Sequence, residues 1–192
     1  MSLNDCAVVE IIAKSVYIRF GYMARSVLSV LGIIAMAVLC KIRCNYMHFH
    51  PNARLLLRTY ILWNLLLSIS LLIMNATNVI RFSTQQSDWC NYLIQVKIGY
   101  PIRALSLIAI FGIELTMLSL CIERAIAVFA YRKYEKSTSK KLAYVMIIFQ
   151  IIGSIWSTIG LNITVTDFEA RTTLIQLRTS TNSDQVKEWD FF

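Results

Sequence analysis

A single carboxyl group stands in the middle of an apolar stretch of this chain. Every residue from Ala104 to Ile122 is uncharged except Glu114. If the surroundings are lipid, a charged carboxyl there is costly, which makes it a functional-site candidate by default. Two uses of the group stay open. It is either a neutral acid hydrogen-bonded to Ser106, Ser119 or Asn64, or part of a pocket for a ligand or an ion.

Nothing in the sequence supports enzyme chemistry. The chain has no Ser/His/Asp arrangement, no glycine-rich phosphate loop and only two histidines, His48 and His50. Its five cysteines show neither CxxC nor Cys/His spacing, which argues against a metal site. The sequence therefore predicts neither an enzyme nor a cofactor. The net charge of +8 is better explained by loops that face anionic lipid than by nucleic acid, because the basic residues cluster beside apolar stretches.

Charged residues are segregated along the chain. All 19 Lys and Arg and ten of the 11 Asp and Glu lie outside four apolar stretches, residues 26–40, 59–79, 104–122 and 142–166. Hydrophobic residues make up 57% of the chain, against about 45–50% in soluble domains. A soluble protein of 192 residues could not bury that much apolar surface, so the solvent of these stretches is lipid.

The four stretches are predicted to be membrane-spanning helices, because a backbone that crosses lipid must satisfy its own hydrogen bonds. About 20 residues, at about 1.5 Å each, cross a hydrocarbon core of about 30 Å. The first stretch is short and extends toward Tyr22 if Arg25 snorkels to the headgroups. The last runs its full length or ends near Asn162. The predicted all-α layout is an outer segment 1–25, a four-helix membrane region 26–166 and a polar tail 167–192.

The loop charges predict an orientation. Residues 41–58 hold four Lys and Arg and no acid, and residues 123–141 hold six with two acids. Residues 80–103 hold three. Short loops rich in Lys and Arg stay in the cytoplasm, so the N-terminus is predicted to lie outside and the two basic loops inside.

Three segments resemble a known family. The run from Ile122 to Ala127 (IERAIA), followed by Tyr134-Glu135, is similar to the end of the third helix in nematode serpentine chemoreceptors of the class a superfamily, classes a, ab, b and e. Val128 stands where that family usually has Thr. The run from Phe49 to Asn52 (FHPN) matches the family's Phe-His-x-Asn before its second helix. A looser match ahead of the first span, as in classes a and ab, involves Cys6, Ser15 and Arg19.

The resemblance implies a seven-helix G-protein-coupled receptor that connects an external small molecule to a heterotrimeric G protein. In that architecture the Glu123-Arg124 pair, with Tyr134 and Glu135 nearby, is a switch. The carboxylate holds the arginine at rest and releases it toward the sixth helix or the G protein. The alternative is an interfacial ion pair with a snorkelling arginine. The resemblance also makes His50 and Asn52 the loop motif before the second helix.

Four predicted spans, rather than seven, set this chain apart from the family it resembles. The expectation is an incomplete receptor of the plasma or sensory-cilium membrane. The alternative is a four-span fragment or scaffold that assembles with full-length receptors. On the outer side, a Cys6–Cys90 disulfide and an unpaired Cys90 thiol both stay open.

Overall fold

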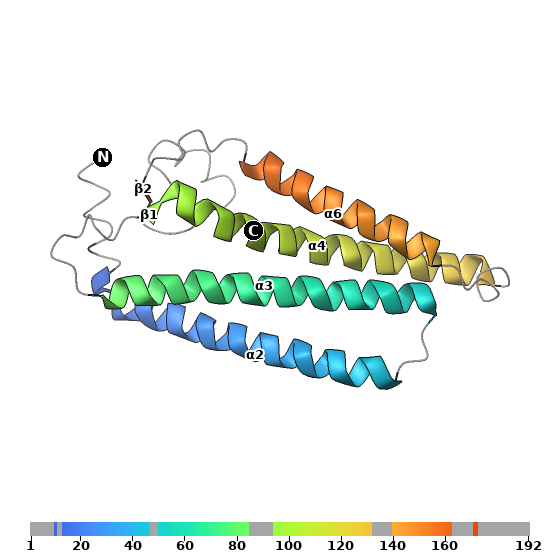
Figure 1. The fold of residues 1–192 in the computed structure, drawn as a ribbon, viewed down its shortest axis with the longest axis horizontal. Coiled ribbons are helices and arrows are strands. Elements are labelled where there is room, and N and C mark those ends of the chain that lie inside the picture. The colour runs from blue at the N-terminus through green and yellow to red at the C-terminus, as the bar shows by residue number, and fades with distance from the viewer. Residues whose placement is uncertain are drawn as a thin grey trace. The chain divides into compact units, whose positions relative to one another are not determined.

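The computed structural model describes residues 10, 13–46, 50–84, 94–131, 140–162 and 171–172. These residues form four long helices, α2 (Val16–Tyr46), α3 (Pro51–Ser83), α4 (Val96–Phe129) and α6 (Lys141–Asn162). A short antiparallel pairing joins β1 (Ile94–Gln95) to β2 (Arg171–Thr172). The predicted all-α, four-span fold is therefore confirmed, with two-residue strands added (Figure 1).

Each helix contains a segment long and apolar enough to cross a membrane, namely Val16–Lys41, Pro51–Ser83, Ile98–Phe129 and Lys141–Gly160. The predicted stretches lie inside the four helices, apart from residues 163–166, which are outside the described residues. Helices α2, α3 and α4 extend beyond the predicted stretches at both ends. Lys and Arg near a membrane surface do not end a helix, because their long side chains can reach the headgroups.

The first helix begins at Val16 rather than near residue 26 because Ser15 caps it. The backbone N–H of Ile18 donates to Ser15 Oγ at 3.4 Å, and that of Arg19 to Ser15 O at 3.3 Å. The second helix begins at Pro51, eight residues before the predicted stretch 59–79, since proline at a first helical position needs no N–H donor.

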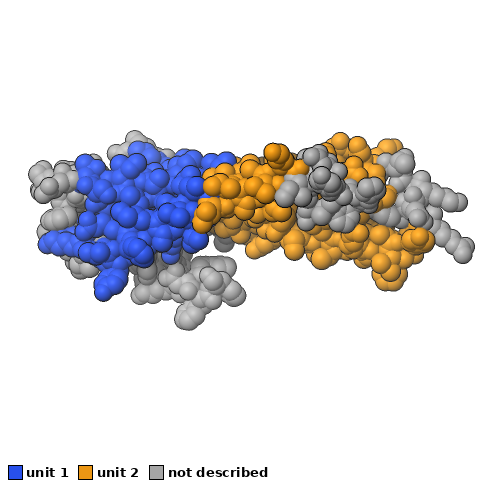
Figure 2. Space-filling model, turned by 90° about the horizontal axis from the view of Figure 1, so that it is seen from below, with its two compact units in different colours: residues 1–30, 69–105, 161–192 blue, residues 31–68, 106–160 orange. Residues whose placement is uncertain are grey.

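The chain divides into two compact units, coloured separately in Figure 2. Unit 1 comprises residues 1–30, 69–105 and 161–192. Within it Tyr22 of α2 stacks on Phe82 of α3, with ring centroids 6.1 Å apart, and the Arg81 guanidinium lies 4.8 Å from the centroid of the Phe82 ring.

Unit 2 comprises residues 31–68 and 106–160. Small residues allow its helices to approach closely, as is common between membrane helices. A Cβ added to Gly112 of α4 would lie 2.5 Å from the Trp63 ring of α3, and one added to Gly153 of α6 would lie 2.9 Å from Leu115 of α4.

Eight serine and threonine hydroxyls in the helices bond within their own helix. Each donates to the carbonyl four residues earlier, at 2.6–3.1 Å, in Ser26, Ser29, Thr59, Thr77, Thr116, Ser119, Ser154 and Thr158. The Asn64 amide does the same with Tyr60 O at 2.8 Å. These groups are therefore satisfied without a second helix, as an apolar solvent requires.

Candidate functional site

The carboxyl of Glu123 is fully buried near the end of α4. Its side chain is 0% exposed, whereas that of Arg124 is 54% exposed. Arg124 Nε lies 3.2 Å from Glu123 Oε2, so the two side chains form an ion pair. Within the described part of the chain no hydrogen bond reaches Glu123 Oε2, so the contact of this oxygen with Arg124 Nε is electrostatic. Such a pair is weaker than a bidentate, hydrogen-bonded one, which leaves Arg124 able to exchange partners.

The predicted loop motif lies at the end of unit 2 where α3 begins and α4 ends (Figure 1). Asn52 is 3% exposed, and its neighbours Ala53 and Leu56 are fully buried. His50 precedes the helix, and its carbonyl accepts from the Arg54 backbone N–H at 3.0 Å. The motif therefore anchors the first turn of α3.

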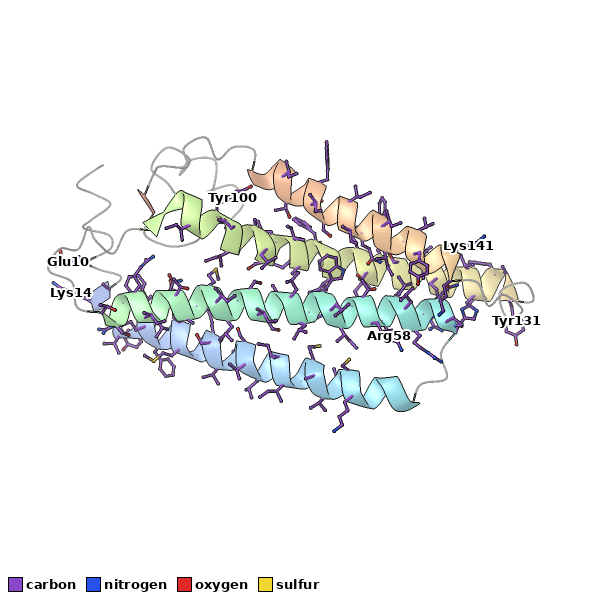
Figure 3. The ribbon with its side chains drawn as sticks, viewed as in Figure 1. Glu10, Lys14, Arg58, Tyr100, Tyr131 and Lys141 are labelled. Atoms are coloured by element: carbon purple, nitrogen blue, oxygen red, sulfur yellow. The ribbon has the colours of Figure 1, made fainter. Side chains whose placement is uncertain are left out.

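Basic side chains lie at this same end of unit 2. Figure 3 shows Arg58 of α3 and Lys141 at the start of α6 toward it, with Tyr131 just beyond α4. Arg58, Lys140 and Lys141 are exposed. A surface of this kind suits an acidic partner or anionic headgroups.

Four of the predicted site residues lie outside the described residues: Tyr134, Glu135, Cys6 and Cys90. Their proposed roles, including either state of Cys90, stay predictions. Among the described cysteines whose side chains are placed, Cys40 and Cys121 are free thiols and exposed.

Glu114 and Glu123 lie on opposite faces of α4. Nine residues at about 100° each amount to two and a half turns, so the two carboxyls point in opposite directions. The face of Glu123 is buried and also carries Thr116 and Ser119. The face of Glu114 is exposed.

The expected hydrogen bond of Glu114 is not found among the described residues. Ser119 is five residues further on, about 140° around the helix, and bonds elsewhere. Asn64 donates within its own helix. Ser106 is buried, whereas Glu114 is exposed. A role for Glu114 in binding a ligand or an ion stays a prediction.

A buried amide that sequence reasoning missed joins α6 to α4. Gln150 is 0% exposed. Its Oε1 accepts from Thr116 Oγ1 at 2.9 Å, and its Nε2 donates to Ser119 Oγ at 2.9 Å. Both hydroxyls also donate to carbonyls of α4. Ser119 donates to Leu115 O at 2.8 Å, and Thr116 shares its one hydroxyl hydrogen between Gln150 Oε1 and Gly112 O, the latter at 2.6 Å. We call these three side chains the Gln150 clasp.

The clasp has a signal in the sequence. Gln150, Ser154 and Thr158 recur every four residues in a largely apolar helix, and all three are buried. Such a spacing places polar groups on one face, and a face of that kind turns away from lipid.

Replacement of the Gln150 amide is expected to weaken the pairing of α4 with α6. Interhelical hydrogen bonds contribute about 0.6 kcal/mol each on average, so Gln150→Leu should lower the free energy of unfolding by about 1–2 kcal/mol. Phe149→Leu is the control, because Phe149 is exposed on the same helix. Thermal unfolding in detergent measures both variants. Equal stability of the two would show that the clasp does not hold the helices together.

Comparison with known proteins identifies the family. The family described as "Serpentine type 7TM GPCR receptor class ab chemoreceptor" matches residues 3–186, which include all four helices and the Glu123-Arg124 pair. No curated protein and no solved structure matches the chain. The resemblance to the class a superfamily is confirmed and narrowed to class ab. The chain is therefore a multi-pass membrane protein that belongs to the nematode class ab serpentine chemoreceptors, a receptor family and not a family of enzymes.

Proposed function

We propose that this chain acts in chemosensory signalling, with Glu123 and Arg124 as the element that controls coupling to a heterotrimeric G protein. The unequal burial of the pair carries the proposal. A buried carboxyl holds an exposed arginine at 3.2 Å, which is one arrangement of a two-state contact. When an external small molecule favours the other arrangement, Arg124 leaves Glu123 for an acceptor on the G protein.

The proposed orientation places this pair in the cytoplasm. The basic loops 41–58 and 123–141 hold four and six Lys and Arg, and both adjoin the end of unit 2 where α3 begins and α4 ends. The positive-inside tendency then places that end inside the cell and the N-terminus outside.

Labelling of single cysteines tests the orientation. In a version whose own five cysteines are replaced by serine, Ser2→Cys should react with a membrane-impermeant maleimide on intact cells. Ser137→Cys, in the second basic loop, should react only after the cells are permeabilised. The opposite pattern would reject the orientation.

A signalling assay tests the switch. The described residues hold four membrane-length helices, where the family has seven. A ligand shifts the equilibrium between two receptor conformations only if it makes different contacts with each of them. Four helices offer few such contacts. The 192 residues expressed alone are therefore expected to give no G-protein response to a small-molecule extract of nematode culture medium. A chimera that adds three helices of a class ab receptor should respond.

Variants of the pair separate the switch from a structural ion pair. In the chimera, Glu123→Gln should raise basal G-protein activity because Arg124 loses its charged partner, and Arg124→Ala should abolish the response. A basal activity unchanged by Glu123→Gln, at equal surface expression, would favour the structural ion pair. A response from the 192 residues alone that Arg124→Ala abolishes would show that four helices suffice.

A second candidate function is a non-signalling partner of full-length receptors. The exposed carboxyl of Glu114 favours it, because such a group calls for a neighbour beyond the described residues. Co-expression tests this role: a partner should change the surface level of a full-length class ab receptor, and Glu114→Leu should cancel the change.

A further inference from the structure

The side-chain amide of Asn52, in the first turn of α3, has a buried acceptor that needs a donor. Asn52 is 3% exposed, and its Oδ1 has no hydrogen-bond partner among the described residues. A buried amide oxygen without a donor is costly, so such groups are rarely left unsatisfied. Because this atom is already covered, neither solvent nor lipid nor a further helix packed on the outside reaches it. Its partner has to come from a helix that already lies against α3.

The packing of α3 on α4 in unit 2 shows which residue lies opposite Asn52. A Cβ added to Gly112 of α4 would lie 2.5 Å from the Trp63 ring of α3, so these two residues lie at one level. The two helices run in opposite directions (Figure 1). Asn52 lies eleven residues before Trp63, and Glu123 lies eleven residues after Gly112. Eleven residues make three turns, about 16 Å, and return to within about 20° of the same face. Asn52 and Glu123 are therefore expected to face each other at one level.

The burial of the residues between these points agrees with this register. Glu123 is 0% exposed, and Leu56, one turn after Asn52, is also 0% exposed. Ser119, one turn before Glu123, is 5% exposed. The facing sides of α3 and α4 therefore stay covered up to the ends that carry Asn52 and Glu123.

Helix α6 presents no polar side chain on its α4-facing side at this level. The Gln150 clasp fixes how α6 lies along α4, and Ala143 lies two turns before Gln150 on the same face. Ala143 is fully buried, close to the level of Glu123. Alanine has no hydrogen-bonding group, so the polar contact across this part of unit 2 is between α3 and α4.

An asparagine amide can serve a carboxyl in either of its protonation states. Its Nδ2–H groups donate to an ionised carboxylate, and its Oδ1 accepts from the O–H of a carboxylic acid. A half turn of the amide exchanges the two atoms with almost no change in shape. Asn52 can therefore hold the Glu123 carboxyl from the buried side, while Arg124 approaches it at 3.2 Å from the exposed side.

We propose that Asn52 is a positioning residue for the Glu123-Arg124 pair, in which its amide hydrogen-bonds the Glu123 carboxyl from α3 and fixes where that carboxyl holds Arg124. The loop motif before α3 and the Glu-Arg motif of α4 then form one site. The contact of Asn52 with Glu123 does not require signalling, whereas the positioning role rests on the proposed function.

Exchange of the two groups tests the contact in the full 192-residue chain. Asn52→Asp places a second carboxyl against Glu123 and should lower the unfolding temperature in detergent by about 4 °C. Adding Glu123→Gln restores one carboxyl and one amide in exchanged positions, so most of the loss should be recovered. If Asn52→Asp yields no folded protein, recovery of membrane yield by Glu123→Gln is the readout. Losses that simply add would overturn the proposal.

Asn64→Asp is the matched control. Asn64 lies on the same helix, twelve residues from Asn52, and its amide donates to Tyr60 O within α3. Glu123→Gln should therefore recover none of the stability that Asn64→Asp loses. Recovery in both backgrounds would show a general benefit of removing one carboxylate, and it would also overturn the proposal.

Basal G-protein activity of the chimera described above tests the positioning role. Asn52→Leu removes the amide and should raise basal activity about as much as Glu123→Gln does, at equal surface expression. The two changes together should add little, because both act through one carboxyl. A rise with Glu123→Gln but none with Asn52→Leu would overturn the positioning role. No rise with Glu123→Gln would reject the proposed switch and the positioning role with it, whereas the exchange experiment would still decide the contact.

Discussion

Gly112→Ala is expected to destabilise unit 2 through one added methyl group. The new Cβ would lie 2.5–2.8 Å from three atoms of the Trp63 indole ring, closer than carbon atoms can approach. A flat, rigid ring cannot move aside as a flexible side chain would, so either the ring rotates or α3 and α4 separate. Overpacking of this kind costs about 1–3 kcal/mol, and better helix propensity offsets up to about 1 kcal/mol of it.

Two other glycines serve as matched controls. A Cβ on Gly21 of α2 or on Gly160 of α6 meets no atom within 4 Å. Gly21→Ala and Gly160→Ala should therefore leave the unfolding temperature in detergent unchanged or raise it slightly. Trp63→Phe should partly rescue Gly112→Ala, because a smaller ring makes room. A Gly112→Ala protein as stable as the two controls would contradict the close packing of α3 on α4.

Glu114→Lys is expected to reduce membrane yield strongly, and Glu114→Gln is not. A fixed cation near mid-membrane costs about 2.5–3.5 kcal/mol on insertion scales, whereas an amide carries no charge. Because Glu114 is exposed, the added bulk of lysine clashes with none of the described residues, and the effect isolates the charge. The amount of chain extracted from the membrane fraction, relative to the parent, measures it.

Leu118→Lys is the control for this result, since Leu118 lies one turn away and is also exposed. It should lower membrane yield by a similar amount. An equal loss for Glu114→Gln and Glu114→Lys would mean that the carboxyl itself is needed, which would favour a ligand or ion site at Glu114.

The number of helices and their order could be predicted from the sequence because charge segregation marks lipid-facing segments directly. The start of α2 could not, since Arg19 and Arg25 look like a membrane boundary but lie inside a capped helix. A long side chain separates the depth of a charge from the depth of its backbone.

The buried faces were harder to predict than the helices. In a soluble helix the apolar face is the buried face, but here Leu28 and Phe149 are exposed because lipid covers them as well as protein does. Only polar residues indicate the inner face, and Gln150 with Thr116 and Ser119 follows that rule. Glu114 breaks it. The pairing of Glu123 with Arg124 followed from the family resemblance, whereas its unequal burial required coordinates.

The hydroxyl bonds within helices bear on how the protein is made. A helix whose Ser and Thr hydrogens already reach its own carbonyls can enter the bilayer alone, before any neighbour exists. Gln150 is different, because its side chain needs α4. The ribosome completes α6 after α4, so Thr116 and Ser119 are in the membrane when Gln150 arrives. Because of this order of synthesis, the hydroxyls of α4 are already in the membrane when the Gln150 amide needs hydrogen-bond partners.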